Sequence, residues 1–371
     1  MKITGIRVTH IRPRSAFLTM TTDEGVTGYG EAVLEGRGPT VETAVRELSE
    51  YLIGKDPRQI EHHWQAMYRG TFYRGGPVLV SAISGVEQAM WDIMGKWLNV
   101  PVYQLLGGAV RNRIRMYRHV HGTKEELREN CRHAVEQGYT MVKTPLDEYA
   151  HVTETQAWIR RQVERLEVIR EVIGPDRDFG VDFHGRVSPS LAIRLAKEME
   201  HLHPMFIEEP VLPENVDALA TVARSTTIPI ATGERLYTKW GFREVLEKQA
   251  AAIVQPDVAH CGGILEGKKI AAMAECYFVG FAPHNAIGAV NLAASLQLVA
   301  TVPNFVAQEQ VFLGEGFLKE PFVVKNGYIE LSTKPGLGIE LDEEGVKTMS
   351  YSGDHQMPFS THEDDGSVAD W

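Results

Sequence analysis

The sequence predicts an α/β protein in which a (β/α)8 barrel follows a small α+β domain, and three observations support this prediction. Residues 2–31 form three short runs of alternating apolar and polar residues separated by turn residues, as in an antiparallel sheet. Residues 40–106 then carry apolar residues at spacings of three and four, which indicates helices. After them, eight β-rich runs alternate with helix-length segments, the pattern of a parallel sheet that closes into a barrel.

The order of these patterns divides the chain into three parts. We expect an N-terminal α+β domain at 1–110, the barrel at 111–326, and a turn-rich, strand-like C-terminal segment at 327–371 that packs back on the first domain. The eight predicted strands are RIRMY (113–117), YTMVKT (139–144), DFGVDF (178–183), PMFIEE (204–209), IPIATGE (228–234), AAIVQPD (251–257), FVGFAPH (278–284) and NFVAQE (304–309).

Composition excludes several classes of function. The chain has 371 residues, 43% hydrophobic and 23% charged, which is typical of a globular protein. A net charge of −11 without a basic stripe argues against nucleic acid as a partner. No apolar run approaches the roughly 20 residues that span a bilayer, and the N-terminus lacks a signal-peptide core, so we expect a cytoplasmic protein with no membrane partner. Cys131, Cys261 and Cys276 lack CxxC spacing and are expected to be unpaired, small buried side chains.

Acidic residues follow three consecutive predicted strands. The third strand ends in Asp182, the fourth in Glu208 and the fifth in Glu234. Because the carboxyl ends of parallel strands meet at one rim of a barrel, these acids would repel one another unless a cation lies between them. An all-carboxylate ligand set suits Mg²⁺ better than Zn²⁺. The alternative is that each acid pairs with a lysine or arginine of the barrel.

Histidines accompany these acids. His184 lies two residues after Asp182, so on a strand both side chains would face the same space. The sixth strand ends in Asp257 and the seventh in His284, a pair in which the carboxylate can orient the imidazole of a general base. The eighth strand ends in Glu309. Taken singly, each histidine could instead be a hydrogen-bonded structural residue or a cap of a neighbouring helix.

The ordered set of strand-end residues resembles the enolase superfamily, in particular the mandelate racemase subgroup, and within it the D-galactonate dehydratases and related acid-sugar dehydratases. The resemblance covers nearly the whole chain. The segments that carry it are FYRGGPVLVSAISG (72–85), DFHGR (182–186), FIEEPVLPEN (206–215), QPDVAHCGGI (255–264), TKPGLGIELDE (333–343) and HEDDGSVADW (362–371).

The resemblance implies an enolase-like fold, with an N-terminal α+β capping domain over a modified TIM barrel, (β/α)7β. It also implies one Mg²⁺ per subunit, held by Asp182, Glu208 and Glu234, and a homo-oligomer, with an octamer as the form that the family suggests. The substrate would be an aldonate similar to D-galactonate, which is dehydrated through an enediolate to a 2-keto-3-deoxy acid.

The resemblance further assigns the proton transfers. His284, backed by Asp257, would take the C2 proton, and His184 would give a proton to the departing C3 hydroxyl. Glu309 would lie beside the other substrate oxygen and could donate a hydrogen bond if burial raised its pKa. We assign further substrate contacts to the mouth of the barrel, at Arg14, His119, Lys143 and Arg235.

Three departures from the pattern of these dehydratases affect the mouth of the barrel. The second strand ends in Lys143, Thr144 and Pro145, where galactonate dehydratases show Lys-x-Asn, and proline has no side-chain donor or acceptor. The first barrel strand runs into Arg118, His119, Val120 and His121, where these dehydratases usually carry an aromatic and small residues. Asn285 follows His284 without the expected proline. These positions leave the identity of the acid sugar open.

Two other classes of function remain open from the sequence. An epimerase or lactone cycloisomerase would use the same metal and enolate but would return the proton or close a ring. A non-catalytic relative that binds sugar acids would retain the scaffold without the reaction. The position of His184 separates the first alternative from dehydration, because an acid for a leaving group lies near C3 and a second base lies near C2.

Overall fold

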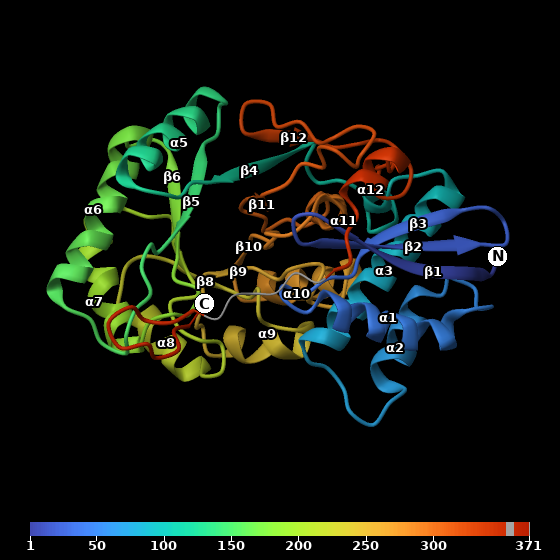
Figure 1. The fold of residues 1–371 in the computed structure, drawn as a ribbon, viewed down its shortest axis with the longest axis horizontal. Coiled ribbons are helices and arrows are strands. Elements are labelled where there is room, and N and C mark those ends of the chain that lie inside the picture. The colour runs from blue at the N-terminus through green and yellow to red at the C-terminus, as the bar shows by residue number, and fades with distance from the viewer. Residues whose placement is uncertain (354–359, 371) are drawn as a thin grey trace.

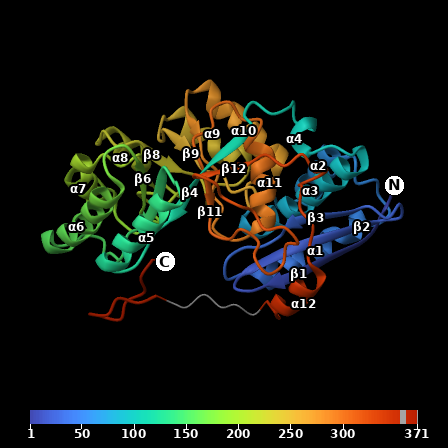
Figure 2. The ribbon, with the colours of Figure 1, turned by 90° about the horizontal axis from the view of Figure 1, so that it is seen from above.

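The computed structural model describes residues 1–353 and 360–370, and it shows an N-terminal unit beside a barrel (Figure 1). The blue strands and helices of the N-terminal unit lie at one side of the molecule, and the green helices of the barrel lie at the other. The view from above shows the same separation along the long axis (Figure 2). Among the described residues, no helix is long and apolar enough to cross a membrane.

The N-terminal unit is an antiparallel sheet packed on helices. Its strands, in the order β1-β2-β3, are β1 (Ile3–Ile11), β2 (Ser15–Thr22) and β3 (Thr27–Glu31). Its helices are α1 (Gly38–Leu52), α2 (Ile60–Arg69), α3 (Pro77–Leu98) and the short α4 (Val102–Leu105). Leu18, Val86 and Met90 belong to a buried core cluster that joins this sheet to α3. The antiparallel opening and the helical stretch that the sequence predicts are both present.

The second unit is a parallel barrel of eight strands. They are β4 (Arg113–His119), β5 (Met141–Pro145), β6 (Asp178–Asp182), β7 (Phe206–Glu208), β8 (Ile230–Thr232), β9 (Ile253–Val254), β10 (Gly280–Phe281) and β11 (Gln308–Gln310). Neighbours along the chain pair in parallel from β4 to β10, and β11 pairs with β4. A parallel bridge between Phe281 and Phe305 joins the two ends of this order. The fold is therefore the expected enolase-like barrel with an N-terminal cap.

Helices cover the outside of the barrel between the strands (Figure 1). They are α5 (Lys124–Glu136), α6 (Gln156–Ile173), α7 (Pro189–Met199), the 3₁₀ helix η1 (Glu200–Leu202), α8 (Val216–Arg224), α9 (Thr238–Glu247), α10 (Ile264–Cys276) and α11 (Ala289–Val299). Thr123 caps α5 by accepting from the backbone N–H of Glu126, whose side chain accepts in return from the backbone N–H of Thr123. This cap fixes where α5 begins and hence where the loop after β4 ends.

The interior of the barrel is filled by side chains. One buried cluster takes Tyr117, Met141, Phe206 and single residues from four further strand segments, including Ile253. Strand β6 contributes Gly180 instead, and a Cβ there would lie 2.5 Å from the ring of Phe206. The barrel is thus a packed core rather than a channel, and the polar residues lie beyond it at the carboxyl ends of the strands.

The residues after the barrel contact both units. Strand β12 (Tyr328–Glu330) pairs antiparallel with β4, and α12 (Glu343–Met349) lies beside the N-terminal sheet, where Arg12 N–H donates to Met349 O at 3.0 Å (Figures 1 and 2). The last described residues return to the barrel, because Ser360 Oγ lies 2.8 Å from the hydroxyl of Tyr149.

The three cysteines are unpaired, as the sequence predicts, and two of them are buried. The prediction that all three are buried is wrong for Cys276, which is exposed at the last position of α10. The pattern that predicts a helix there does not fix which face its final turn presents to solvent.

Candidate active site

Three acidic side chains meet at the carboxyl ends of neighbouring strands. Asp182 ends β6, Glu208 ends β7, and Glu234 lies two residues beyond β8. One oxygen from each of the three carboxylates lies within 4.8 Å of the others. Asp182 and Glu208 are buried, and the side chain of Glu234 is 13% exposed. The structure therefore brings together the acids that the sequence places one βα unit apart.

Buried polar groups surround this acid cluster. The ammonium group of Lys143 lies 2.6 Å from Glu208 Oε1, 2.6 Å from Glu309 Oε1 and 3.3 Å from Asp182 Oδ2. The amide of Gln255 donates to the second oxygen of Glu208 at 2.8 Å. Lys143 is 1% exposed, so its ammonium group contacts these carboxylates from the buried interior of the barrel.

The electrostatics of the cluster favour a cation. Burial raises the pKa of Glu208 well above its usual range, and the charges of Asp182 and Glu309 raise it further, although Lys143 lowers it. Burial alone would also raise the pKa of Asp182, but His184 and Lys143 hold it below the usual value. A hard divalent ion with oxygen ligands would relieve this excess of negative charge, so the residues fit Mg²⁺.

His284 and Asp257 form the predicted pair. The ring Nδ1 lies 2.7 Å from Asp257 Oδ2, and because a carboxylate only accepts, Nδ1 carries the proton and donates. The other nitrogen, Nε2, faces Glu234 at 3.0 Å and Glu309 at 3.6 Å. Burial lowers the pKa of His284, but Glu309 and Glu234 outweigh burial and raise it well above the usual value.

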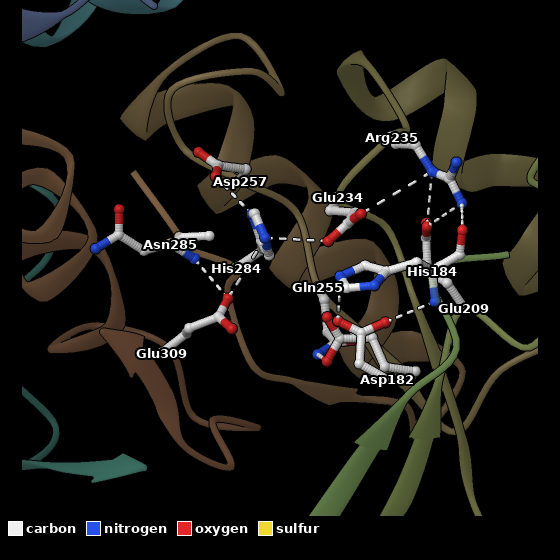
Figure 3. A network of polar contacts seen from close by, with 12 residues as sticks. Asp182, His184, Glu209, Glu234, Arg235, Gln255, Asp257, His284, Asn285 and Glu309 are labelled. Carbon is white, nitrogen blue, oxygen red and sulfur yellow. Dashed lines mark hydrogen bonds and ion pairs between the residues drawn. The ribbon is translucent and has the colours of Figure 1, made fainter. Parts of the chain in front are cut away.

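His184 lies on the other side of the acid cluster. Its Nε2 lies 3.1 Å from Asp182 Oδ2, and its backbone N–H donates to Asp182 Oδ1 at 2.8 Å. The residue has a left-handed φ of 50°, which turns the chain sharply after β6. Figure 3 shows the carboxylate of Glu234 between His184 and His284. The two imidazoles thus approach one space from strands that are separated by β7, β8 and β9.

Arg235 supports the turn at His184. Its guanidinium bonds to Glu209 Oε2 through Nε at 2.7 Å, and its terminal nitrogen donates to the carbonyl of His184 at 3.0 Å (Figure 3). Burial and Glu234 raise the pKa of Glu209 to about 8, although Arg235 lowers it. The predicted substrate contact Arg235 is therefore engaged with the protein and orients the loop that carries His184.

Glu309 is held by three donors. The imidazole Nε2 of His119 lies 2.6 Å from Glu309 Oε1, which also contacts Lys143, and the backbone N–H of Asn285 donates to Oε2 at 2.8 Å. Burial raises the pKa of Glu309, but the charges of Lys143 and His284 outweigh it and hold the pKa well below the usual value. The condition under which Glu309 could donate, a pKa raised by burial, is not met in this arrangement, because a buried lysine and two histidines adjoin the carboxylate.

The remaining residues of the mouth come from both units. Arg14, in the turn between β1 and β2, pairs with Glu35 at 2.6 Å and donates to the carbonyl of Ala286 at 3.3 Å, two residues after His284. Arg14 therefore connects the capping domain to the loop that carries His284.

Pro145 ends β5 beside Asp182, so no side-chain donor follows Lys143 on the same side of that strand.

Sequence reasoning missed several polar residues that complete the site. Gln255 lies two residues before Asp257, the same spacing as Asp182 and His184, and that alternation could have indicated it. Glu209 adjoins Glu208, but its left-handed φ of 40° turns it toward Arg235, which no pattern of residue types predicts. Asn291 lies in α11 and reaches Asp257 only through the tertiary fold.

A second group of potential ligands lies outside the acid cluster, in the loop after β5 and in the C-terminal residues. In residues 1–353 and 360–370, His151, His362 and Asp364 also have donor atoms within 4.8 Å of one another. The two imidazoles stack with centroids 3.8 Å apart and an interplanar angle of 17°. Because an imidazole lone pair lies in the plane of its ring, the two rings direct their lone pairs in nearly parallel, offset planes rather than toward one ion. We interpret this group as a contact between the C-terminal residues and the loop after β5.

Comparison with known families agrees with this architecture. The sequence model described as "Mandelate racemase / muconate lactonizing enzyme, N-terminal domain" matches residues 6–107, and the one described as "Enolase C-terminal domain-like" matches residues 126–345. The chain belongs to the mandelate racemase subgroup of the enolase superfamily. The acids at the strand ends are thus a site on an enolase-superfamily barrel.

Relatives of this superfamily member cover its full length. It is 46% identical over 383 aligned positions to a D-galactonate dehydratase from Cronobacter sakazakii and 44% identical to one from Variovorax paradoxus, with 100% of both chains covered in each case. A mandelate racemase/muconate lactonizing enzyme-like protein from Rubrobacter xylanophilus is 35% identical, with a TM-score of 0.90 over 95% of this chain and 98% of that chain. An enolase-superfamily member from Salmonella Typhimurium is 32% identical, with a TM-score of 0.89 over 93% and 97%.

Proposed function

We propose that this enzyme dehydrates an acid sugar, an aldonate similar to D-galactonate, to a 2-keto-3-deoxy acid. It is a hydro-lyase of the kind that its full-length relatives are named for. The observation that carries the proposal is the placement of His184 and His284 on two sides of one acid cluster, which supplies a base and a separate acid (Figure 3). We further propose a cytoplasmic homo-oligomer with one Mg²⁺ per subunit.

The first step is proton abstraction at C2. Asp257 accepts a hydrogen bond from Nδ1–H of His284, so that the neutral ring has its lone pair on Nε2, directed into the site. Burial lowers the pKa of His284 but the charges of Glu309 and Glu234 raise it, and a cation held by Glu234 would offset their effect and favour the neutral ring. Nε2 takes the C2 proton, and the electrons of the C–H bond form an enediolate with the substrate carboxylate. A Mg²⁺ ion held by Asp182, Glu208 and Glu234 would supply positive charge that offsets the negative charge of this enediolate.

The second step is departure of the C3 hydroxyl. The electrons of the enediolate form the C2–C3 double bond, the C3–O bond breaks, and the imidazolium of His184 gives the oxygen a proton, so that water leaves. His184 Nε2 lies 3.1 Å from Asp182 Oδ2, so the ring is held at the acid cluster, where the departing hydroxyl would lie. The resulting enol becomes the keto acid. The step requires no second base at C2, which distinguishes it from epimerisation.

The substrate contacts belong to the mouth of the barrel. We propose that Arg14, His119, Lys143 and Arg235 set the shape and charge of this mouth, directly or through the groups they hold. Pro145 offers no side-chain hydrogen bond where galactonate dehydratases have asparagine. A substrate hydroxyl that bonds to that asparagine would here meet an apolar ring, so the preferred aldonate would differ in configuration or tolerance at that carbon.

The experiment is a screen of a stereochemically complete set of aldonates and aldarates with Mg²⁺, scored for 2-keto-3-deoxy product by colour reaction and NMR. We expect one aldonate, or a few that differ at a single carbon, to give product with loss of one water. The Asp182→Asn variant is the matched control and should lose activity on all of them. Recovery of an epimer or a lactone without any keto acid would refute the dehydratase assignment.

A further inference from the structure

Asp257 is held from both sides. Its Oδ2 accepts from His284 Nδ1 at 2.7 Å. Its Oδ1 accepts from the side-chain amide of Asn291 at 2.9 Å and from the backbone N–H of Ala259 at 2.7 Å. Loss of the bonds to Oδ1 would free the carboxylate to rotate about its χ2 angle, and the hydrogen bond that selects the tautomer of His284 would weaken.

The amide of Asn291 has no freedom to turn. Its Nδ2 donates to Asp257 Oδ1 and to Asn285 Oδ1, both at 2.9 Å, and its Oδ1 accepts from the amide of Gln88 at 3.2 Å. A flipped amide would direct an oxygen at the carboxylate of Asp257, which cannot donate when ionised. Asn291 is 1% exposed, so no solvent replaces these partners.

The anchor of Asn291 comes from the capping domain. The carboxylate of Glu31, at the end of β3, accepts from the backbone N–H of Asn291 at 2.7 Å, in the first turn of α11. The helix has Gly288 at its N-cap and no side-chain cap of its own, so Glu31 satisfies an N–H group that would otherwise lack an acceptor. A Cβ at residue 288 would lie 1.9 Å from Glu31 Oε1, which shows how closely the two units approach.

Two further bonds fix Glu31. The hydroxyl of Ser15 donates to Glu31 Oε1 at 2.6 Å, and the backbone N–H of Glu31 donates to the side-chain oxygen of Gln88 at 2.8 Å. Gln88 lies in α3 and also donates to the carbonyl of Val258, the residue after Asp257. A continuous buried chain of hydrogen bonds therefore runs from β2 and β3 of the capping domain to the imidazole of His284.

We propose that Asn291 and Glu31 are positioning residues for the base: they hold Asp257 in the orientation that keeps the proton of His284 on Nδ1. The capping domain thereby controls the protonation geometry of the barrel's base as well as covering the barrel. The catalytic part of this inference rests on the proposed function, whereas the tautomer of His284 can be measured without substrate. None of the hydrogen bonds of Asn291 and Glu31 described above involves an acid of the cluster formed by Asp182, Glu208 and Glu234.

The test reads the tautomer directly in the Mg²⁺-loaded protein, at a pH high enough for the ring of His284 to be neutral. Nitrogen-15 NMR of histidine-labelled enzyme distinguishes Nδ1–H from Nε2–H, and the His284→Asn variant assigns the signal. We expect Nδ1–H in the wild type and a loss of that preference in Asn291→Leu, which keeps the branching at Cγ without polar atoms, and in the smaller Asn291→Ser. In both variants kcat should fall about 10- to 100-fold, as for other groups that orient a catalytic histidine, with KM and Mg²⁺ affinity nearly unchanged.

Glu31 allows a conservative rescue and a matched control. Glu31→Leu should shift the tautomer, whereas Glu31→Gln should retain it, because an amide oxygen still accepts from Asn291 N–H. Glu87 of α3 is the control, since it accepts from the backbone N–H groups of Ile264 and Leu265 in the first turn of α10, again across the two units. Glu87→Leu should lower stability without changing the tautomer.

Two results would overturn the proposal. One is a folded Asn291→Leu or Asn291→Ser enzyme with the wild-type tautomer and kcat. The other is a Glu87→Leu variant that shifts the tautomer as much as Glu31→Leu does, because the effect would then reflect general loosening of the domain contact. An altered tautomer in an enzyme that dehydrates no aldonate would support the positioning role and reject only the proposed reaction.

Discussion

The carboxyl group of Glu208 has a pKa that its surroundings raise well above the usual range. It is 1% exposed and lies among other acids, and burial together with these acids raises its pKa well above the usual range despite Lys143. A carboxyl with a raised pKa holds a proton in the metal-free protein over part of the accessible pH range. A cation that binds there must displace that proton.

Mg²⁺ binding is therefore expected to release a proton and to tighten with rising pH. Below the raised pKa of Glu208, affinity should increase by up to about tenfold per pH unit, and it should level off above that pKa. Calorimetry at several pH values, in buffers with different heats of ionisation, measures the protons released. Glu208→Gln should abolish the pH-dependent part. Equal heats in all buffers at low pH would contradict the account.

Residue types at strand ends were the predictable part of the site. Asp182, Glu208 and Glu234 could be placed together because parallel strands present their carboxyl ends at one rim, whatever the details of packing. The low pKa of Glu309 could not be predicted, because it depends on how closely Lys143 and His119 approach that carboxylate. Neither distance follows from spacing along the chain.

In the contact between β3 and α3, the sequence pattern likewise predicts the two elements but not how closely they pack. Both elements are predicted by their periodicity, but their close approach depends on glycines. A Cβ at Gly30 of β3 would lie 2.0 Å from the carbonyl oxygen of Gly85 in α3, and the atom in the way is backbone. Since Glu31 follows Gly30 directly, the close approach of β3 to α3 also determines where the carboxylate of Glu31 meets the first turn of α11.

Gly30→Ala is expected to destabilise the protein by roughly 2–4 kcal/mol, because backbone must move to admit the methyl group. Gly241→Ala is the matched control: Gly241 lies within α9, and its nearest neighbour to an added Cβ is 3.7 Å away. That variant should be neutral or stabilising by up to about 1 kcal/mol, from helix propensity. Urea unfolding followed by circular dichroism measures both. Similar losses in the two variants would contradict the packing argument.

Strand lengths were the less predictable feature of the elements. The run AAIVQPD predicts a strand to Asp257, yet β9 covers only Ile253–Val254. Pro256 has no N–H to donate to a neighbouring strand, and Gln255 turns its amide toward Glu208. The chain leaves the sheet early at the position where its polar side chains begin to build the site.

At the level of the whole molecule, the proposed Mg²⁺ site would link metal binding to folding. The three acids that would hold the ion come from β6, β7 and the loop after β8, and they converge only in the folded barrel. A ligand that binds the native state alone stabilises it in proportion to the logarithm of its concentration. The unfolded chain has no such site, so the metal should raise the stability of the whole barrel.

Mg²⁺ at about 100 times its dissociation constant should add about 2.7 kcal/mol to the free energy of unfolding. The melting temperature should rise by several degrees, as scanning calorimetry would show. Asp182→Asn should remove this shift. Asp178→Asn, at the opposite end of β6 where Asp178 pairs with Arg115, should keep it. An unchanged shift in the Asp182 variant would place the ion elsewhere.

The division of proton transfers between two histidines is the central claim about the working enzyme. His284 and His184 approach the acid cluster from β10 and β6, and each contacts a different acid of that cluster, Glu234 and Asp182 respectively. Removal of the acid should therefore leave the reversible C2 step intact, and removal of the base should abolish both steps. His201, exposed in η1, provides a control histidine that should be dispensable.

The most direct test is NMR of recovered substrate after incubation in deuterated water with Mg²⁺ and each variant. His184→Asn should exchange the C2 proton for deuterium while forming keto acid about 10² to 10⁴ times more slowly than the wild type, and His201→Asn should behave as the wild type. His284→Asn should do neither. Exchange by the His284 variant but not by the His184 variant would contradict the assignment and reverse the two roles.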